Sequence, residues 1–387
     1  MTHIPRRPIG RTALSVPELG FGAASLGNLY APVADADART AIDAALAAGL
    51  RYVDTAPHYG RGLSERRVGD AVRLQPDTVV STKVGRLMDP DASITDDSER
   101  DGFRSPMPFR MRYDYTHDGI LRSHEHSLQR MGVAQVDLLY VHDIGRYTHG
   151  DAADGYWQQL TSGGGLKALE RLRDEGTITG FGIGVNEIQV CLEVMAEARL
   201  DAVLLAGRYT LLEQEALDAL FPACAAAGTS IVIGGPYNSG ILATGTRRGG
   251  TVHYDYGPAP APVLTRVRGI EAVADRHGVA LPAAALAFVL AHPLVASVIP
   301  GIGSAARVTQ TVDLYHAVIP AAFWDELRGE GLLRPDAPVP GARHDRRRNP
   351  PVAERQRRGR LPQPDPRRDD RSRGDRTGHH RKGRSRS

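Results

Sequence analysis

Lysine is nearly absent from this chain of 387 residues, which holds 48 lysines and arginines together but only three lysines, Lys83, Lys167 and Lys382. Arginine therefore supplies almost every positive charge. A guanidinium stays charged in proteins, whereas an amine can change its pKa and take part in proton chemistry. Lys83 lies near the end of a β-branched run, 78–84. A reactive role for Lys83 competes there with the ordinary role of a solvated charge at a strand end.

Cysteines and long apolar runs are scarce as well. Cys191 and Cys224 are the two cysteines, and they form neither a disulfide framework nor a metal-binding spacing, so we expect buried thiols in a reducing compartment. No apolar run reaches the roughly 18 residues that a membrane helix needs, and no apolar segment follows the polar start 1–8 as a secretory signal would require. The sequence thus predicts a cytoplasmic protein without membrane attachment.

Charge divides the chain into two parts. Residues 341–387 hold 17 basic and 6 acidic residues, a net charge of +11, so the net charge of +3 for the whole chain leaves −8 for residues 1–340. The segment 341–387 is rich in Arg, Pro, Gly, Asp and Ser, and it cannot bury enough apolar area to offset the entropy of ordering it. We predict one domain over residues 1–340 and a disordered, basic C-terminal tail.

Two further interpretations of the tail stay open. Its arginines, for example Arg346, Arg347 and Arg348, would attract nucleic-acid phosphates, but the six acidic residues and the lack of aromatic residues beyond histidine make nucleic-acid binding a weak prediction. The composition also resembles a high-GC gene translated out of frame or past its normal end, and the segment 332–340 reads like a natural terminus.

Strand-like and helix-like segments alternate along the rest of the chain. The strand candidates are short, apolar on both faces and rich in β-branched residues, which is typical of buried parallel strands; they cover 19–25, 51–56, 78–84, 136–142, 180–185, 202–209, 230–235 and 296–300. A helix-like pattern follows each one, at 35–48, 64–74, 116–131, 165–175, 187–198, 213–227, 263–277 and 305–317. Eight strand–helix units predict an α/β fold, a (β/α)8 TIM barrel.

Three of the connections are long, namely 86–115, 143–164 and 237–262. All three would lie on the C-terminal face of the barrel, where this fold builds its active sites, and loops of this length serve as lids, bind ligands or are disordered. Four loop aromatic residues are candidates for contacts with a sugar, although packing within the loops is the simpler role for each: Tyr30, Tyr147, Trp157 and Tyr254.

Four polar residues fall on one rim of the predicted barrel. Asp54, Lys83 and His142 end three neighbouring strands, and Tyr59 follows Asp54 by five residues. Each has an ordinary explanation alone, but their coincidence favours a common site for proton transfer coupled to hydride transfer. An ammonium held by a carboxylate favours the phenolate of a tyrosine, whose unperturbed pKa is about 10, and that tyrosine can then exchange a proton with a substrate oxygen. No metal-binding spacing is evident, because the histidines of 124–126 do not form an H-E-x-x-H motif.

The segment Asp54-Thr55-Ala56-Pro57-His58-Tyr59-Gly60, together with Lys83 and His142, resembles the catalytic tetrad of the aldo-keto reductase superfamily. The resemblance extends over about residues 8–333 and includes Leu19-Gly20-Phe21-Gly22 and Val298-Ile299-Pro300-Gly301. The segments 56–65, 182–186 and 207–214 are more closely similar to the branch that contains D-threo-aldose 1-dehydrogenase, L-fucose and L-galactose dehydrogenase-like enzymes and pyridoxal 4-dehydrogenase.

This resemblance implies a role for each of the four residues. Tyr59 would be the general acid and base, Lys83 would lower its pKa, Asp54 would anchor Lys83, and His142 would position the reacting oxygen. The activity implied is hydride transfer between a nicotinamide cofactor and an aldose, an aldehyde or a hemiacetal, with a sugar oxidised to its lactone. Oxidation of pyridoxal stays an alternative, and so does a non-catalytic regulatory subunit that binds a dinucleotide, although the intact tetrad argues against the latter.

The last predicted strand leads into a glycine-rich helix entry that contains Gly301, Gly303, Ser304 and Arg307. Free N–H groups at a helix start suit a phosphate, although a simple cap at Ser304 would look the same. No G-x-G-x-x-G motif is present here or after the first strand. The resemblance implies that this entry binds the adenosine end of NAD or NADP, with Arg307 near a phosphate. Many NADP-preferring members have a lysine at the position of Gly301, so NAD is slightly favoured.

Other positions depart from the family pattern. A Ser-Asn pair that many members use on the nicotinamide amide appears as Gly184-Val185, followed by Asn186, and a usual glutamine appears as Ala206. A stacking tyrosine appears as Gly234, with Tyr237 three residues further on. Asn186 and Tyr237 are candidates to take over roles of these replaced residues, with loop packing as the alternative. The oligomeric state is not indicated.

Overall fold

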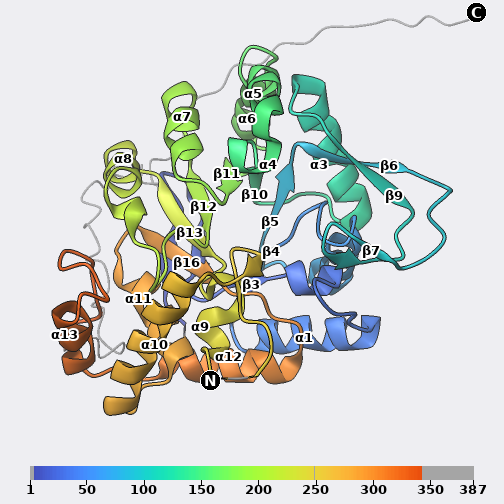
Figure 1. The fold of residues 1–387 in the computed structure, drawn as a ribbon. Coiled ribbons are helices and arrows are strands. Elements are labelled where there is room, and N and C mark those ends of the chain that lie inside the picture. The colour runs from blue at the N-terminus through green and yellow to red at the C-terminus, as the bar shows by residue number, and fades with distance from the viewer. Residues whose placement is uncertain (1–3, 248, 342–387) are drawn as a thin grey trace, which may run out of the picture. The chain divides into compact units, whose positions relative to one another are not determined.

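The computed structural model describes residues 4–247 and 249–341, and our predictions for residues 342–387 lie outside the described residues. Eight parallel strands form one sheet in the order β16-β13-β12-β11-β10-β5-β4-β3. Parallel bridges between Leu19 and Val298 and between Gly22 and Gly301 join the first and last strands. The sheet is thereby closed into a barrel surrounded by helices (Figure 1), so the predicted (β/α)8 fold is confirmed.

The eight barrel strands lie where the sequence predicted them, most of them with narrower bounds. They are β3 (Phe21–Gly22), β4 (Tyr52–Asp54), β5 (Val79–Val84), β10 (Leu138–His142), β11 (Gly180–Val185), β12 (Ala202–Ala206), β13 (Ser230–Gly234) and β16 (Val295–Ile299). β3 is the most shortened, because the 3-10 turn η1 (Ala24–Gly27) begins inside the predicted strand.

The helices that cover the barrel mostly match the predicted ones. They are α1 (Asp35–Ala47), α2 (Leu63–Val72), α3 (His117–Met131), α6 (Gly165–Asp174), α7 (Gln189–Glu197), α8 (Leu220–Ala227), α10 (Ala261–Arg276) and α12 (Ala305–His316). The predicted helix 213–227 was wrong in part. Its first half is the 3-10 turn η3 (Glu215–Leu217), and α8 starts at Leu220 because Pro222 is tolerated only in a first turn.

In the part of the chain that the structure describes, the sequence pattern missed two helices outside the long connections, α11 (Leu281–Ala291) and α13 (Ala321–Gly329). α11 packs beside β16, and its residues from Leu281 to Leu290 other than Pro282 are buried. A helix that is apolar all round has no amphipathic period, which explains why the sequence pattern did not reveal it. Among the described residues, no single helix is long and apolar enough to cross a membrane; α10 and α11 pass such a test only as a pair, with a 100° bend between them.

Alternate residues of the strands face the inside of the barrel, because side chains two residues apart share one face of a strand. A buried cluster that includes Tyr52, Leu138, Tyr140 and Leu204 fills this interior. The hairpin of β1 (Arg6–Pro8) and β2 (Ser15–Pro17) closes the N-terminal end, since the buried Ile9 and Val16 belong to the same cluster. A larger cluster lies between strands and helices.

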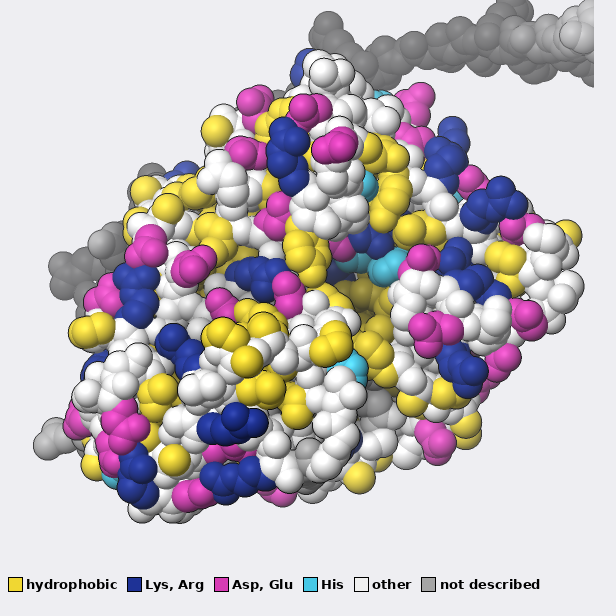
Figure 2. All heavy atoms as spheres, in the orientation of Figure 1, with side chains coloured by type: hydrophobic (Ala, Val, Ile, Leu, Met, Phe, Trp, Pro, Cys, Tyr) yellow, Lys and Arg dark blue, Asp and Glu magenta, His cyan; other side chains and the backbone are white. Residues whose placement is uncertain are grey.

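The three long connections follow the C-terminal ends of β5, β10 and β13, as predicted. The first forms the hairpin of β6 (Arg86–Pro90) and β9 (Phe109–Tyr113), with β7 (Glu99–Arg100) and β8 (Phe103–Arg104) between them. The second contains α4 (Arg146–His149), η2 (Gly150–Ala152) and α5 (Ala153–Leu160), and the third η4 (Asn238–Gly240), α9 (Ile241–Thr244), β14 (His253–Tyr254) and β15 (Gly257–Pro258). Figure 2 shows a surface hollowed at its centre, with basic and histidine side chains inside the hollow.

We predict that Leu286→Ala in α11 lowers the free energy of unfolding by about 2–5 kcal/mol, because it leaves a cavity beside the barrel wall. Leu286 is fully buried, whereas Leu74 is 82% exposed. Leu74→Ala is therefore the matched control, with an expected change within about 0.5 kcal/mol. Urea titration measures both changes; equal losses in the two variants would contradict the buried position of α11.

Candidate active site

Asp54, Lys83 and His142 meet because they are the last inward-facing residues of three adjacent strands. Asp54 pairs in register with Ser81 on β5, and Lys83 follows Ser81 by two residues on the same face. Tyr140 pairs with Lys83, so His142 extends one step beyond it on β10. The structure thus brings three of the predicted residues to one end of the barrel interior.

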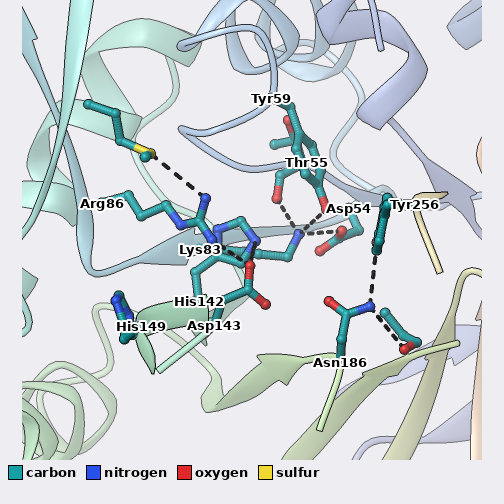
Figure 3. A network of polar contacts seen from close by, with 12 residues as sticks. Asp54, Thr55, Tyr59, Lys83, Arg86, His142, Asp143, His149, Asn186 and Tyr256 are labelled. Carbon is teal, nitrogen blue, oxygen red and sulfur yellow. Dashed lines mark hydrogen bonds and ion pairs between the residues drawn. The ribbon is translucent and has the colours of Figure 1, made fainter. Parts of the chain in front are cut away.

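The ammonium of Lys83 is the centre of this group (Figure 3). Its Nζ donates hydrogen bonds to Oδ2 of Asp54 at 2.7 Å, to the carbonyl oxygen of Thr55 at 2.9 Å and to the hydroxyl of Tyr59 at 3.1 Å. The side chains of Lys83 and Asp54 are only 2% and 3% exposed. Ser81 also donates to Asp54, from Oγ to Oδ1 at 2.7 Å. Each of these contacts replaces water that burial removes from the charged pair.

The loop that carries Tyr59 is held by a close backbone approach. A Cβ atom on Gly60, which has φ +63°, would lie 2.4 Å from the carbonyl oxygen of Gly27. Only glycine fits this position without displacing the neighbouring segment. The first long loop covers the other side, because the ring of Phe103 stacks on Tyr59 with centroids 5.9 Å apart.

Electrostatics at Tyr59 differ from the sequence-based expectation. Burial raises the pKa of Tyr59, and the nearby positive charge of Lys83 opposes this shift without reversing it. Lys83 thus acts on the pKa of Tyr59 in the predicted direction, but burial, which the sequence did not reveal, has the larger effect in the free protein. Burial alone would lower the pKa of Lys83, but the charges of Asp54 and Tyr59 outweigh it and raise that pKa, so Lys83 is an ammonium.

His142 is a neutral imidazole beside this group. Burial lowers its pKa well below the usual value, and the charges of Arg86 and Lys83 lower it further. Its ring packs edge-on to Tyr59 with centroids 6.0 Å apart. Nε2 lies 3.4 Å from Oδ2 of Asp143, while Nδ1 is buried without a partner among the described residues.

Several polar and aromatic neighbours of the tetrad were not predicted. Arg86 begins the loop after β5, Asp143 directly follows His142, and Ser81 supports Asp54. Polar residues at or just beyond strand ends were the signal that could have identified these three. Phe103 had no such signal, because its place beside Tyr59 depends on the fold of a long loop.

The predicted phosphate-binding residues lie where β16 runs into α12. Ser304 caps α12, and its Oγ accepts a hydrogen bond from the backbone N–H of Arg307 at 3.3 Å. Cβ atoms on Gly301 and Gly303 would approach Ser25 no closer than 3.4 Å, so neither glycine is required by its neighbours. The first N–H groups of a helix lack carbonyl partners within it and attract anions.

Asn186 and Tyr237 lie at the ends of β11 and β13. The amide Nδ2 of Asn186 donates to the carbonyl oxygen of Ala206 at 3.1 Å and lies 3.4 Å from the hydroxyl of Tyr256 (Figure 3). The hydroxyl of Tyr237 is buried without a hydrogen-bond partner among the described residues, near enough to Arg307 for its charge to act on the pKa of Tyr237. The Tyr237 hydroxyl is thus a buried polar group that a bound cofactor could pair with.

The four loop aromatics occupy different settings. Tyr30 and Tyr147 are largely exposed, and Tyr147 packs over the guanidinium of Arg208. Trp157 and Tyr254 pack partly against the main core, where the hydroxyl of Tyr254 donates to Glu213. Packing thus describes Trp157 and Tyr254, and a sugar contact stays a prediction for all four residues.

Comparison with known proteins identifies the class. The sequence model of the aldo/keto reductase family matches residues 18–329. The chain therefore belongs to this family, and it is an NAD(P)-dependent oxidoreductase.

Two curated relatives are similar over nearly their whole length. Pyridoxal 4-dehydrogenase from Microbacterium luteolum is 44% identical over 85% of this chain and 98% of its own. D-threo-aldose 1-dehydrogenase from a Pseudomonas species is 40% identical over 83% of this chain and 95% of its own. Among solved structures, the holo form of an aldo-keto reductase from Bacillus halodurans superposes with a TM-score of 0.64 at 26% identity, over 88% of this chain and 99% of that chain.

Because burial lowers the pKa of His142, the unfolded chain takes up a proton at this residue below about pH 6.5 that the folded chain does not. Folding stability contributed by His142 is therefore lost as the pH falls. We predict that His142→Asn reduces the loss of unfolding free energy between pH 7.5 and 5.5 by about 1.4 kcal/mol. Urea titration at the two pH values tests this. An identical loss in both proteins would show that His142 has the same pKa in the folded and the unfolded chain.

Proposed function

We propose that this protein oxidises the cyclic hemiacetal form of an aldose at C1, giving a lactone. The observation that carries the proposal is the hydrogen bond between the Tyr59 hydroxyl and an ammonium, Lys83, that is itself anchored on Asp54. The 40% identity to D-threo-aldose 1-dehydrogenase supports the substrate class. Oxidation of pyridoxal is the second candidate, because the relative that is 44% identical carries that activity in its name.

Tyr59 is the proton-transferring group in this proposal. Since burial raises its pKa, the phenol keeps its proton at neutral pH and is ready to protonate a carbonyl oxygen in the reductive direction. In the oxidative direction the phenolate accepts the anomeric hydroxyl proton, and the phenolate fraction grows as the pH rises. The ammonium of Lys83 stabilises that phenolate.

Asp54 and His142 support this proton transfer without exchanging the proton themselves. Asp54 keeps Lys83 charged at 2.7 Å. His142 packs edge-on against the ring of Tyr59. Because its imidazole is neutral, it orients the substrate oxygen by a hydrogen bond and not by charge. A family of oxidoreductases and an intact tetrad together argue against a non-catalytic regulatory subunit.

For the cofactor we propose NAD over NADP. Gly301, Gly303, Ser304 and Arg307 would hold the phosphates, and Asn186 and Tyr237 would hold the nicotinamide end. The nicotinamide, when bound, supplies the hydride acceptor. Gly301 provides no charge for a 2′-phosphate, and the guanidinium of Arg307 is already bonded to Gln310 at 2.7 Å, which favours the cofactor without that phosphate.

The proposal also covers the bounds of the catalytic domain and the cellular compartment. Residues 1–340 form the catalytic domain, because both hydrophobic clusters lie within them. A reducing, cytoplasmic setting agrees with the buried free thiols of Cys191 and Cys224.

Turnover of a substrate panel tests the proposed function. The panel contains L-fucose, L-galactose and pyridoxal, each with NAD and with NADP, and cofactor reduction is followed by absorbance. We expect the highest kcat/KM for an aldose with NAD. A higher kcat/KM for pyridoxal would favour the second candidate, and no turnover with any pair would contradict both.

The role of Tyr59 is tested by Tyr59→Phe. We expect turnover to fall by about 10²–10⁴-fold, because the proton-transferring hydroxyl is removed, while the affinity for NAD, measured by fluorescence titration, stays unchanged. Tyr209→Phe is the matched control, since the buried hydroxyl of Tyr209 has no partner among the described residues and its ring packs on Phe221 and Phe288, outside the tetrad. Full turnover by Tyr59→Phe would refute the assignment.

A further inference from the structure

A second ion pair lies directly beside the tetrad. The Nη2 of Arg86 is 2.5 Å from Oδ2 of Asp143 (Figure 3). The same carboxylate oxygen is 3.4 Å from Nε2 of His142, and the charge of Asp143 acts on Tyr59. Any molecule whose reacting oxygen is held by Tyr59 and His142 therefore has this pair as its neighbour.

The pair retains unused hydrogen-bonding capacity. The side chain of Arg86 is 5% exposed, yet its Nε is buried without a partner among the described residues. Its remaining contacts are a weak one from Nη1 to the sulfur of Met111 at 3.7 Å and the ring of Tyr113. The side chain of Asp143 is 18% exposed, and its Oδ1 accepts no hydrogen bond from a described residue. The acceptor that the pair leaves free is therefore Oδ1 of Asp143, because Nε of Arg86 is buried out of reach.

The backbone at Asp143 also points to a function beyond packing. Asp143 has φ +47°, a left-handed conformation that non-glycine residues rarely adopt. Its N–H is fixed to the carbonyl oxygen of Gly184 at 3.0 Å. Such strain is concentrated at functional sites, where the surrounding structure holds the residue in place.

We propose that Arg86 and Asp143 bind the hydroxyl group that neighbours the reacting carbon of the substrate, and so select hydroxylated hemiacetals over simple aldehydes. This inference rests on the proposed function. A hydroxyl is a neutral hydrogen-bond donor, so it can donate to Oδ1 of Asp143 while Nη2 of Arg86 holds the other carboxylate oxygen. The C2 hydroxyl of an aldose and the phenolic hydroxyl beside the aldehyde carbon of pyridoxal share this chemistry.

An anionic substituent is a poorer fit at this position. The charges of Arg86 and Asp143 balance each other, as do those of Lys83 and Asp54, and His142 is neutral. The free carboxylate oxygen of Asp143 would repel a phosphate or carboxylate placed there. A neutral hydrogen-bond donor suits the pair better.

Substrate pairs that differ in this one hydroxyl test the proposal. They are L-fucose with its 2-deoxy analogue, and pyridoxal with its analogue lacking the phenolic hydroxyl. We expect the wild type to prefer the hydroxylated member of its substrate pair by at least about 100-fold in kcat/KM, because a site built to bind a hydroxyl rejects the analogue without it. In Asp143→Asn and Arg86→Met the preference should fall below about tenfold, because the variants lose more turnover with the hydroxylated member than with the deoxy member. The pair in which the preference appears identifies the hydroxyl that is bound.

Asp143→Asn keeps the side-chain shape, and asparagine tolerates the left-handed backbone, so this variant remains informative if Arg86→Met does not fold. Asp91→Asn and Arg110→Met are the matched controls. Asp91 and Arg110 form an ion pair at 2.7 Å on the same hairpin, with the Arg110 side chain 74% exposed. Both control variants should keep the wild-type preference.

Three results would overturn the inference. If the variants lose turnover equally with both members of a pair, Arg86 and Asp143 only position His142. If the wild type shows no preference, the hydroxyl is not bound here. If the wild type turns over neither the panel nor the analogues, the proposed function itself fails. This outcome differs from the first two, in which the wild type is active.

Discussion

A single ammonium, on Lys83, lies inside the C-terminal end of the barrel and joins a carboxylate, a carbonyl oxygen and a phenol. A charge removed from water is tolerated only where protein groups replace its hydration, and here Asp54, Thr55 and Tyr59 do so from one strand end and the loop after it. Losing one member of such a buried pair costs about 3–5 kcal/mol. The geometry of the site and the stability of this end of the barrel therefore depend on the same contacts.

The parallel barrel makes this arrangement possible because its register is shared by neighbouring strands. Tyr52, Ser81 and Tyr140 form a hydrogen-bonded layer across three strands, with the two tyrosine hydroxyls 3.1 Å apart. Asp54, Lys83 and His142 form the next layer towards the open face. The long loops add side chains around this layer. For example, Phe103 packs on the ring of Tyr59. The strand ends thus hold the buried ion pair, and the loops form the wall around it.

The sequence predicted the parts of the fold and site that depend on local patterns. Apolar β-branched runs identified the eight strands, and polar residues at their ends identified Asp54, Lys83 and His142. α11 was missed because uniform burial removes the helical period. The effect of Lys83 on the pKa of Tyr59 was predicted in direction, but the larger effect of burial was not, because a sequence shows a charged neighbour and not the depth of burial. Arg86 and Asp143 follow the ends of β5 and β10 and carried the same strand-end signal, but their pairing with each other could be seen only in the structure.

The central claim is that the charge of Lys83 controls the proton equilibrium of Tyr59. The most direct measurement is the pH dependence of single-turnover aldose oxidation by the wild type and by Lys83→Met at saturating NAD. Because an ammonium favours the phenolate, the account predicts that the rising limb of the profile moves to higher pH by at least about one unit in the variant. A rising limb at the same pH in both proteins would contradict it.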